Sequence, residues 1–330
     1  MRTIGIDVSK ATLDVALRDE QGVWMKEEQV KNSTAGLRSL LRKWGRQGLC
    51  DKTTLVCLEP TGHYSHGVVK TLLDLGHPTW MAHATDIRLS IGMQRGKSDK
   101  VDARRIAEYA HRFRDKARLL DSTCLDFTQL KTLLALRERL VKERGKDQAQ
   151  MKDNVLYMTG GTKQLVKAEL ERQLKALQRS IANLERAIKA ILTKDHGLAR
   201  KNRLAQTVSG IGPVLASEFI AHTAGFTRFD SPRQLVCYVG AAPFEKTSGS
   251  SVRGKTSTSS FANKRLKSLL RLAALSAVRV DGDLRDYYRR KIAQGKKPIV
   301  VLNNVAGKII HHLWAVIASG KPYKPHLHMS

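Results

Sequence analysis

Hydrophobic and polar positions alternate differently along the chain, and each pattern predicts a different kind of structure. Near the N-terminus, short apolar runs at Thr3 to Ile6, Thr12 to Leu17 and Thr54 to Leu58 have the length and alternation of β-strands. Residues 97–114 instead repeat apolar side chains at helical spacing. Across the whole of residues 1–115 we expect the order strand, strand, strand, helix, strand, helix, of which these runs are the clearest members. This order is typical of an RNase H-like domain.

A seven-residue repeat occupies the middle of the chain, with polar residues between apolar ones that alternate steps of four and three. These apolar positions are Leu170, Leu174, Leu177, Ile181, Leu184, Ile188 and Ile191. The spacing predicts a coiled coil. A helical run from Leu130 to Val141 precedes it, and the stretch Thr159 to Thr162, with its glycine pair, predicts a break between the two. We expect an antiparallel helical hairpin whose stripe closes within one chain or between chains, and we favour a homo-oligomer, either dimer or tetramer.

The last third of the chain predicts further helices. Asp230, Ser231 and Pro232 form a helix start, and amphipathic segments follow at about residues 261–280, 282–294 and 299–318. The fold class is therefore α/β plus α. We expect three regions: 1–120, 121–198 and 199–330.

A glycine-rich turn, VSGIGP at Val208 to Pro213, resembles a helix-hairpin-helix turn. Gly210 and Gly212 would let backbone amides approach phosphate groups, and Pro213 suits the first turn of the following helix. The alternative is an ordinary turn between two helices.

Four carboxylates stand where a site for phosphoryl transfer would need them. Asp7 and Glu59 end predicted strands, and Asp99 and Asp102 lie three residues apart, on one face of a predicted helix. Converging carboxylates can hold one or two Mg²⁺ ions, because hard cations prefer oxygen ligands. Each acid alone could instead be a turn or cap residue.

Composition supports a polyanionic partner. The chain has 58 Lys and Arg against 30 Asp and Glu, a net charge of +28. Residues 199–330 alone hold 22 basic and 6 acidic side chains. This excess points to nucleic acid. The chain shows neither an apolar run of about 18 residues nor a signal-peptide layout, so we expect a cytoplasmic protein that does not bind membranes.

A serine-rich loop follows the glycine-rich turn. Residues 243–261, PFEKTSGSSVRGKTSTSSF, contain many hydroxyl groups and several cations, with Glu245 as the single acid. The segment is either a solvated linker or a loop that carries a nucleophilic serine. Composition does not distinguish the two.

Several blocks of sequence resemble one known family. GIDVSKATLDVAL, LEPTGHY, GKSDKVDARRIAEY and the long block VSGIGPVLASEFIAHTAGFTRFDSPRQLVCYVG with its serine loop occur in that order. They are similar to the DEDD transposases and recombinases of bacterial insertion sequences, a family that includes pilin-gene inverting proteins. The resemblance implies an N-terminal RuvC-like domain, a central coiled coil and a C-terminal transposase domain.

The resemblance also implies roles for particular residues. Asp7, Glu59, Asp99 and Asp102 would be the DEDD carboxylates that bind Mg²⁺. Ser248, the first serine of SGSSVRG, would be the nucleophile that forms a phosphoserine link to DNA, with Ser250 and Ser251 as rivals. Arg253 and Lys255 would contact phosphate groups.

Related recombinases are directed by a noncoding bridge RNA that pairs with donor and target DNA, so the resemblance implies a guide RNA as a partner. Two other functions stay open. One is a RuvC-like nuclease that resolves junctions with water as the nucleophile. The other is a nucleic-acid-binding protein without catalysis.

Overall fold

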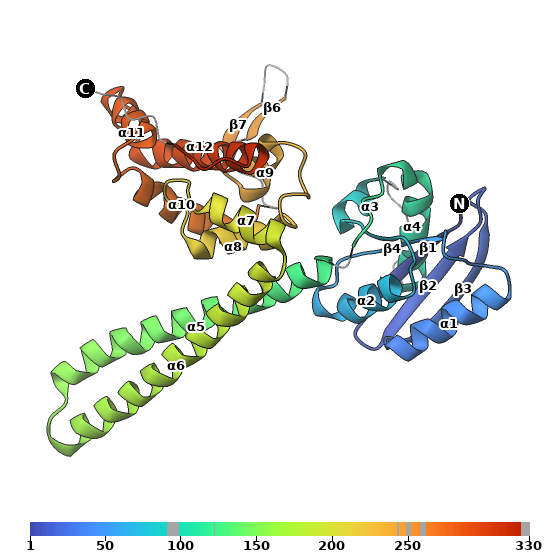
Figure 1. Cartoon of the computed structure of the whole chain (residues 1–330), viewed down its shortest axis with the longest axis horizontal. Coiled ribbons are helices and arrows are strands. Elements are labelled where there is room, and N and C mark those ends of the chain that lie inside the picture. Colours follow the sequence, from blue (N-terminus) through green and yellow to red (C-terminus); the bar gives the residue numbers. More distant parts are fainter. Residues whose placement is uncertain (91–98, 122, 243, 249–251, 258–261, 325–330) are drawn as a thin grey trace. The chain divides into compact units, whose positions relative to one another are not determined.

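The structure is a computed structural model that describes residues 1–90, 99–121, 123–242, 244–248, 252–257 and 262–324. The chain divides into two compact units, Met1–Leu125 and Asp126–Ser330, each with a hydrophobic core of its own (Figure 1). The functional division at residues 120 and 198 stays a prediction.

Unit 1 is built on one mixed sheet with strand order β3-β2-β1-β4-β5. Strand β1 pairs antiparallel with β2 and parallel with β4. The strands are β1 (Thr3–Val8), β2 (Thr12–Arg18), β3 (Trp24–Lys31), β4 (Leu55–Leu58) and β5 (Thr79–Met81). Three antiparallel strands followed by parallel ones are the RNase H-like arrangement, so the predicted class of this domain is confirmed. Strand β5 was not predicted, because three residues after a proline are too few to show an alternation.

Helices cover both faces of this sheet, as Figure 1 shows. The helices of unit 1 are α1 (Thr34–Arg46), α2 (His66–Asp74), α3 (Ala84–Ser90) and α4 (Asp99–Arg112), with short 3₁₀ turns η1 (Gly62–Ser65) and η2 (Arg114–Lys116). Ile4 and Ile6 of β1 belong to a core that includes Leu40 of α1 and Leu72 of α2. Residues with the other parity in β1 face α4, since successive side chains of a strand point to opposite faces.

Helix α4 lies directly against β1 because the residues between them are small. Ala16 of β2 forms a buried cluster with Ala103 and Ala107 of α4. A Cβ atom at Gly5 would stand 2.2 Å from the backbone nitrogen of Ala107 and 2.3 Å from the carbonyl oxygen of Ala103. Only glycine therefore permits this approach, which fixes the height of α4 above the sheet.

Two long helices open unit 2, α5 (Thr123–Tyr157) and α6 (Gly160–Lys194). The boundary between the units falls within the first turn of α5, before Asp126. They run side by side in opposite directions (Figure 1), so the predicted antiparallel pair is confirmed. The break falls at residues 158–159, and the glycine pair begins α6. Leu170 and Ile181 of the apolar stripe are buried within the chain. The coiled-coil geometry itself stays a prediction.

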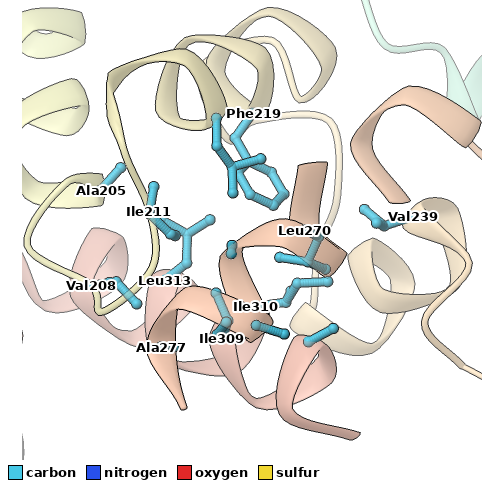
Figure 2. Packing of buried hydrophobic residues seen from close by; sticks show 14 of the residues in the cluster. Ala205, Val208, Ile211, Phe219, Val239, Leu270, Ala277, Ile309, Ile310 and Leu313 are labelled. Carbon is cyan, nitrogen blue, oxygen red and sulfur yellow. The ribbon is translucent and has the colours of Figure 1, made fainter. Parts of the chain in front are cut away.

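The remaining helices of unit 2 pack around a large apolar core, part of which Figure 2 shows. They are α7 (His196–Ala205), α8 (Pro213–His222), α9 (Pro232–Val239), α10 (Lys264–Ala277), α11 (Asp283–Ala293) and α12 (Pro298–Ser319), with a hairpin of β6 (Phe244–Ser248) and β7 (Val252–Ser257) between α9 and α10. Phe219, Ile309 and Leu313 are fully buried in this core. The predicted helix start is confirmed, since the Ser231 side chain accepts a hydrogen bond from the backbone of Gln234.

Helix α12 is, among the described residues, the one helix long and apolar enough to cross a membrane by length and composition. Its buried residues Val305, Ile309 and Leu313 pack in the core of unit 2, which accounts for its hydropathy. The four cysteines, all within the described ranges, are free.

We expect Gly5→Ala to lower the free energy of unfolding by about 3 kcal/mol, because the added methyl group must displace the backbone of α4. Gly67→Ala is a matched control: Gly67 lies in α2, and a Cβ there meets nothing within 4 Å. The control should be neutral or slightly stabilising. Urea unfolding followed by circular dichroism measures both, and equal stability of the two variants would contradict the close packing.

Candidate active site

Two of the four predicted carboxylates are brought together by the pairing of parallel strands. Ile6 of β1 is the register partner of Leu58 of β4. Asp7 and Glu59 are the next residues on each strand, so they lie side by side at the carboxyl edge of the sheet. The prediction that both acids sit at strand ends is confirmed for Glu59, which follows β4, and Asp7 is the last residue but one of β1.

The other two carboxylates open helix α4. Asp99 is its first residue, and Asp102 lies in the same turn. Since α4 is held against β1 at Gly5, its N-terminal turn is carried to the edge at which β1 ends. The charge of Asp102 is partly balanced by Arg105, whose Nη1 is 2.9 Å from Asp102 Oδ1.

Electrostatic coupling links Asp7 to the other three acids. Burial is the largest cause, and together with the negative charges of Asp99, Asp102, Glu59 and Asp14 it raises the pKa of Asp7 to about 6. Burial also raises the pKa of Glu59, again with help from Asp102. The neighbouring negative charges therefore make the ionisation of Asp7 and Glu59 harder, which is the situation that a bound cation relieves.

Within the described ranges, no three acidic, histidine or cysteine side chains stand together as the ligands of a single ion would. The four acids are thus linked by charge rather than by coordination geometry. Their chemistry still fits a hard divalent cation, because all four offer carboxylate oxygens. The hydroxyl of Thr61, two residues after Glu59, is also buried and has no hydrogen-bond partner among the described residues.

Two residues of this region were missed by the sequence reasoning. Asp14 of β2 is the register partner of Asp7, and it is only 2% exposed. Both of its oxygens accept hydrogen bonds from Gln29 Nε2, at 3.1 and 3.0 Å. The alternation of β2 contained the signal, but the pairing register was needed to use it.

His83 is the second missed residue. The backbone nitrogen of Ala82 donates to the carbonyl oxygen of Leu58 at 3.0 Å, so the residues after β5 run beside Glu59. The charge of His83 accordingly opposes the rise in the pKa of Glu59. Because β5 was too short to predict, the position of His83 beside Glu59 could not be predicted either.

The glycines of the predicted phosphate-binding turn have different surroundings in unit 2. Gly210 has φ +88°, and a Cβ there would stand 2.3 Å from the carbonyl oxygen of Ala273 in α10. Close packing of the turn against α10 therefore explains this glycine. Gly212 is the N-cap of α8, and a Cβ there would meet nothing within 4 Å. Phosphate contact by either glycine stays a prediction.

Ser248, Arg253 and Lys255 belong to the β6–β7 hairpin of unit 2. Ser248 is the last residue of β6 and pairs with Val252, while Arg253 pairs with Thr247. Lys255 follows in β7. Residues 244–248 and 252–257 of the serine-rich segment therefore form two paired antiparallel strands, and the choice between a linker and a nucleophile loop stays a prediction. The rivals of Ser248, Ser250 and Ser251, lie outside the described residues.

The sheet order and its acidic edge together define a domain of the RNase H-like class. Residues 4–158 match the family model for transposases of the DEDD IS110 type, and residues 202–289 match that of the transposase IS116/IS110/IS902 family. The chain belongs to this family of insertion-sequence transposases.

Individual relatives agree with this assignment. The pilin gene-inverting protein of Moraxella bovis is 24% identical over 98% of both chains. The transposase for insertion sequence element IS1111A of Coxiella burnetii is 23% identical over 76% of this chain and 70% of its own. An uncharacterised protein of insertion element IS116 from Streptomyces clavuligerus is 28% identical, and this match spans 48% of the present chain and only 38% of that relative.

Among solved structures, Thermus thermophilus RuvC in complex with a Holliday junction substrate aligns with 36% of this chain and 99% of its own. The identity is 16% and the TM-score is 0.30.

We expect Asp7→Asn to stabilise unit 1 when a chelator removes divalent ions. The folded pKa of about 6 lies above the ordinary value of 3.8, so the charged form weakens the fold above pH 6, and this penalty fades as the pH falls towards 4. After allowance for solvent screening the gain at pH 8 is on the order of 1 kcal/mol, or about 4 °C in Tm. Differential scanning fluorimetry across pH measures it.

The exposed Glu20→Gln is the control, since Glu20 makes only a 3.7 Å contact with the N-terminal amine. It should change Tm little at any pH. If Asp7→Asn lowered Tm at pH 8 without metal, Asp7 would not lie in a repulsive cluster. Added Mg²⁺ should stabilise the wild type more than the variant.

Proposed function

We propose that this chain is an insertion-sequence recombinase that cuts and rejoins DNA strands with the N-terminal carboxylates and a serine nucleophile. The proposal is supported by the placement of Asp7 and Glu59 beside each other at two paired strand ends and of Asp99 and Asp102 in the first turn of α4, together with the effect of their charges on the pKa of Asp7. Acids gathered in this way, at the expense of raised pKa values, are typical of functional sites.

Asp7, Glu59, Asp99 and Asp102 would hold the metal, which we take to be Mg²⁺. The bound ion would supply charge stabilisation to a scissile phosphodiester. Among these residues, Asp102 is held by its 2.9 Å ion pair with Arg105. His83, which is exposed next to Glu59, is available to a phosphate group at the same edge.

Ser248 is our candidate for the attacking group. Its oxygen would form a bond to phosphorus while the bond from phosphorus to a deoxyribose oxygen breaks; the serine proton is lost and the departing oxygen gains one. The phosphoserine link keeps the energy of the diester for rejoining. Arg253 and Lys255, on the paired strand β7, are the proposed phosphate contacts. The hairpin would act on a phosphate held by the carboxylates of the same chain or of another copy.

The proposed partners are donor and target DNA, a noncoding guide RNA and further copies of this chain. A net charge of +28, of which residues 199–330 carry the largest part, supports binding to nucleic-acid backbones. Delegating sequence recognition to RNA would leave the protein with mainly backbone contacts. Activity in the cytoplasm belongs to the same proposal.

Two alternatives are distinguished by experiment. A RuvC-like endonuclease would use the same carboxylates with water, and the serine hairpin would be unnecessary. A protein that only binds nucleic acid would need neither, and the raised pKa of Asp7 would then have no function.

We expect Ser248→Ala to abolish covalent attachment to DNA. The full chain is incubated with Mg²⁺, RNA from the element and labelled DNA carrying the element's ends, and the products are separated on a denaturing gel. The wild type should give an adduct that disappears on protease treatment, and the variant none. Free cleaved ends in equal amounts from both proteins would establish the hydrolytic alternative instead.

Replacing any one of the four carboxylates should reduce strand cleavage by at least about a hundredfold, because the remaining acids would not hold the positive charge of the metal ion against the phosphate. The variants are Asp7→Asn, Glu59→Gln, Asp99→Asn and Asp102→Asn. DNA binding, measured by fluorescence anisotropy, should persist. A variant that cleaves at the wild-type rate would exclude its residue from the site.

A further inference from the structure

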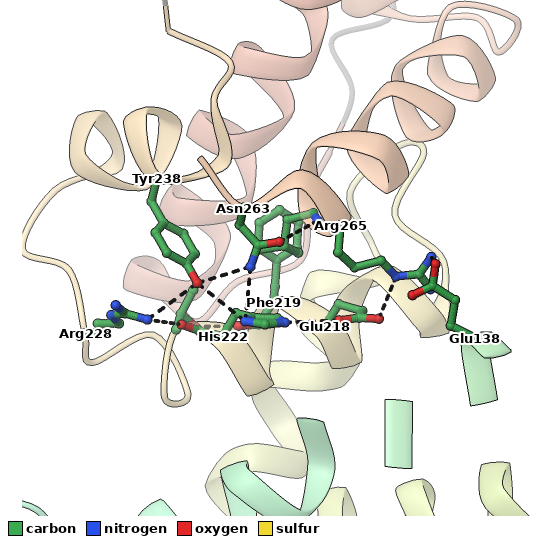
Figure 3. A network of polar contacts seen from close by, with 10 residues as sticks. Glu138, Glu218, Phe219, His222, Arg228, Tyr238, Asn263 and Arg265 are labelled. Atoms are coloured by element: carbon green, nitrogen blue, oxygen red, sulfur yellow. Dashed lines mark hydrogen bonds and ion pairs between the residues drawn. The ribbon is translucent and has the colours of Figure 1, made fainter. Parts of the chain in front are cut away.

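A chain of polar side chains crosses unit 2 beside the apolar core, as Figure 3 shows. It connects four helices that are far apart in the sequence. The residues are Glu138 of α5, Glu218 and His222 of α8, Tyr238 of α9, and Asn263 and Arg265 at the start of α10.

Glu218 is the buried centre of this network. Its side chain is 4% exposed, and its oxygens are 3.1 Å from Arg265 Nε and 3.4 Å from His222 Nε2. Arg265 reaches Glu138 as well, at 2.8 Å. Burial alone would raise the pKa of Glu218, but these hydrogen bonds outweigh it and hold the pKa below its usual value. The carboxylate is therefore satisfied and charged.

Asn263 connects His222 of this network to Tyr238 of α9 and to the first turn of α10. Its Oδ1 accepts from the backbone nitrogen of Leu266 at 3.0 Å and so caps α10. Its amide nitrogen must then face the other way, where it lies 3.2 Å from His222 Nδ1 and 3.1 Å from the hydroxyl of Tyr238. Since Nδ1 of His222 accepts from the Asn263 amide, its Nε2 carries the hydrogen and donates a hydrogen bond to Glu218.

These contacts lie where the serine hairpin leaves and re-enters the helical core. The backbone nitrogen of Asn263 donates to the carbonyl oxygen of Tyr238 at 2.8 Å, which ties the start of α10 to the end of α9. Gly240 has φ +76°, and a Cβ there would stand 2.5 Å from Cβ of Ala262. Asn303 of α12 holds the carbonyl oxygen of Ala241 at 2.8 Å. The two ends of the segment that carries β6 and β7 are thus clamped together.

The apolar core of the same unit shows that helices here pack well without buried charge. A buried ionic network seldom adds stability over apolar packing. Its hydrogen bonds depend on direction, however, so it favours one relative position of the helices where apolar contacts would accept several. We propose that this network positions the β6–β7 hairpin for attack on DNA, with Asn263 and His222 as positioning residues. The inference rests on the proposed role of Ser248 and adds to it the part of the protein that aims the hairpin.

The test is Asn263→Ser, because serine keeps the cap on α10 but lacks the amide nitrogen that reaches His222 and Tyr238. Single-turnover formation of the covalent adduct is measured at saturating DNA, together with the Kd for the same DNA and the Tm. We expect the rate to fall at least about tenfold, since small misplacement of a reacting group is costly, while Kd and Tm stay at wild-type values.

The control is Asp195→Ser, which likewise preserves a helix cap, that of α7, a helix that contributes no residue to the network. It should leave all three quantities unchanged. Tyr238→Phe removes one hydroxyl from the network and provides a second variant should Asn263→Ser fold poorly; it should also slow the adduct. Combined with Asn263→Ser, its effect should be less than additive, because both act through one network.

Ser248→Ala measured alongside separates the two proposals. If the adduct forms equally without Ser248, the proposed function fails. If the adduct requires Ser248 but forms at the wild-type rate in Asn263→Ser and Tyr238→Phe, only the positioning role fails. A lower rate that is wholly explained by a lower Tm or weaker DNA binding would likewise overturn it.

Discussion

The close contact between α4 and β1 is the constraint on which the acidic site depends. Gly5 has no side chain, so the backbone of α4 packs directly against the sheet at this residue. Ala103 and Ala107 of α4 have small side chains that permit the same close contact. The helix then begins at the edge where β1 and β4 end, which brings Asp99 and Asp102 to Asp7 and Glu59. Close packing thus produces the burial and, beside it, the neighbouring negative charges that together raise the pKa of Asp7.

The two units hold their proposed functional residues in different ways. Unit 1 brings like charges together on a rigid sheet, and the sheet tolerates this because dense packing on both faces supports it. Unit 2 carries Ser248, the proposed nucleophile, on one of two paired strands, which have little stability of their own. The stem of that hairpin is held by the hydrogen bonds of Asn263, Tyr238 and Asn303 instead. The two family matches, over residues 4–158 and 202–289, include parts of both units.

Burial within the chain also bears on assembly. The heptad stripe of α6 has its residues Leu170, Ile181 and Ile188 buried without a second copy. The other stripe residues, Leu174, Leu177, Leu184 and Ile191, are half-buried. Closure within one chain or between chains, and the oligomer itself, therefore stay predictions.

Local patterns determined the elements and the residue types of the site. Alternation gave β1, β2 and β4, the 3.6-residue period gave α4 and α10 to α12, and the strand ends singled out Asp7 and Glu59. Tertiary structure decided what those patterns leave open, because register and packing join residues that are distant in sequence. Only the pairing of β1 with β2 revealed Asp14, and only the descent of α4 onto Gly5 explained why Asp99 and Asp102 reach the same edge. The role of Gly210 and the network around Glu218 likewise depend on contacts between helices that no local period encodes.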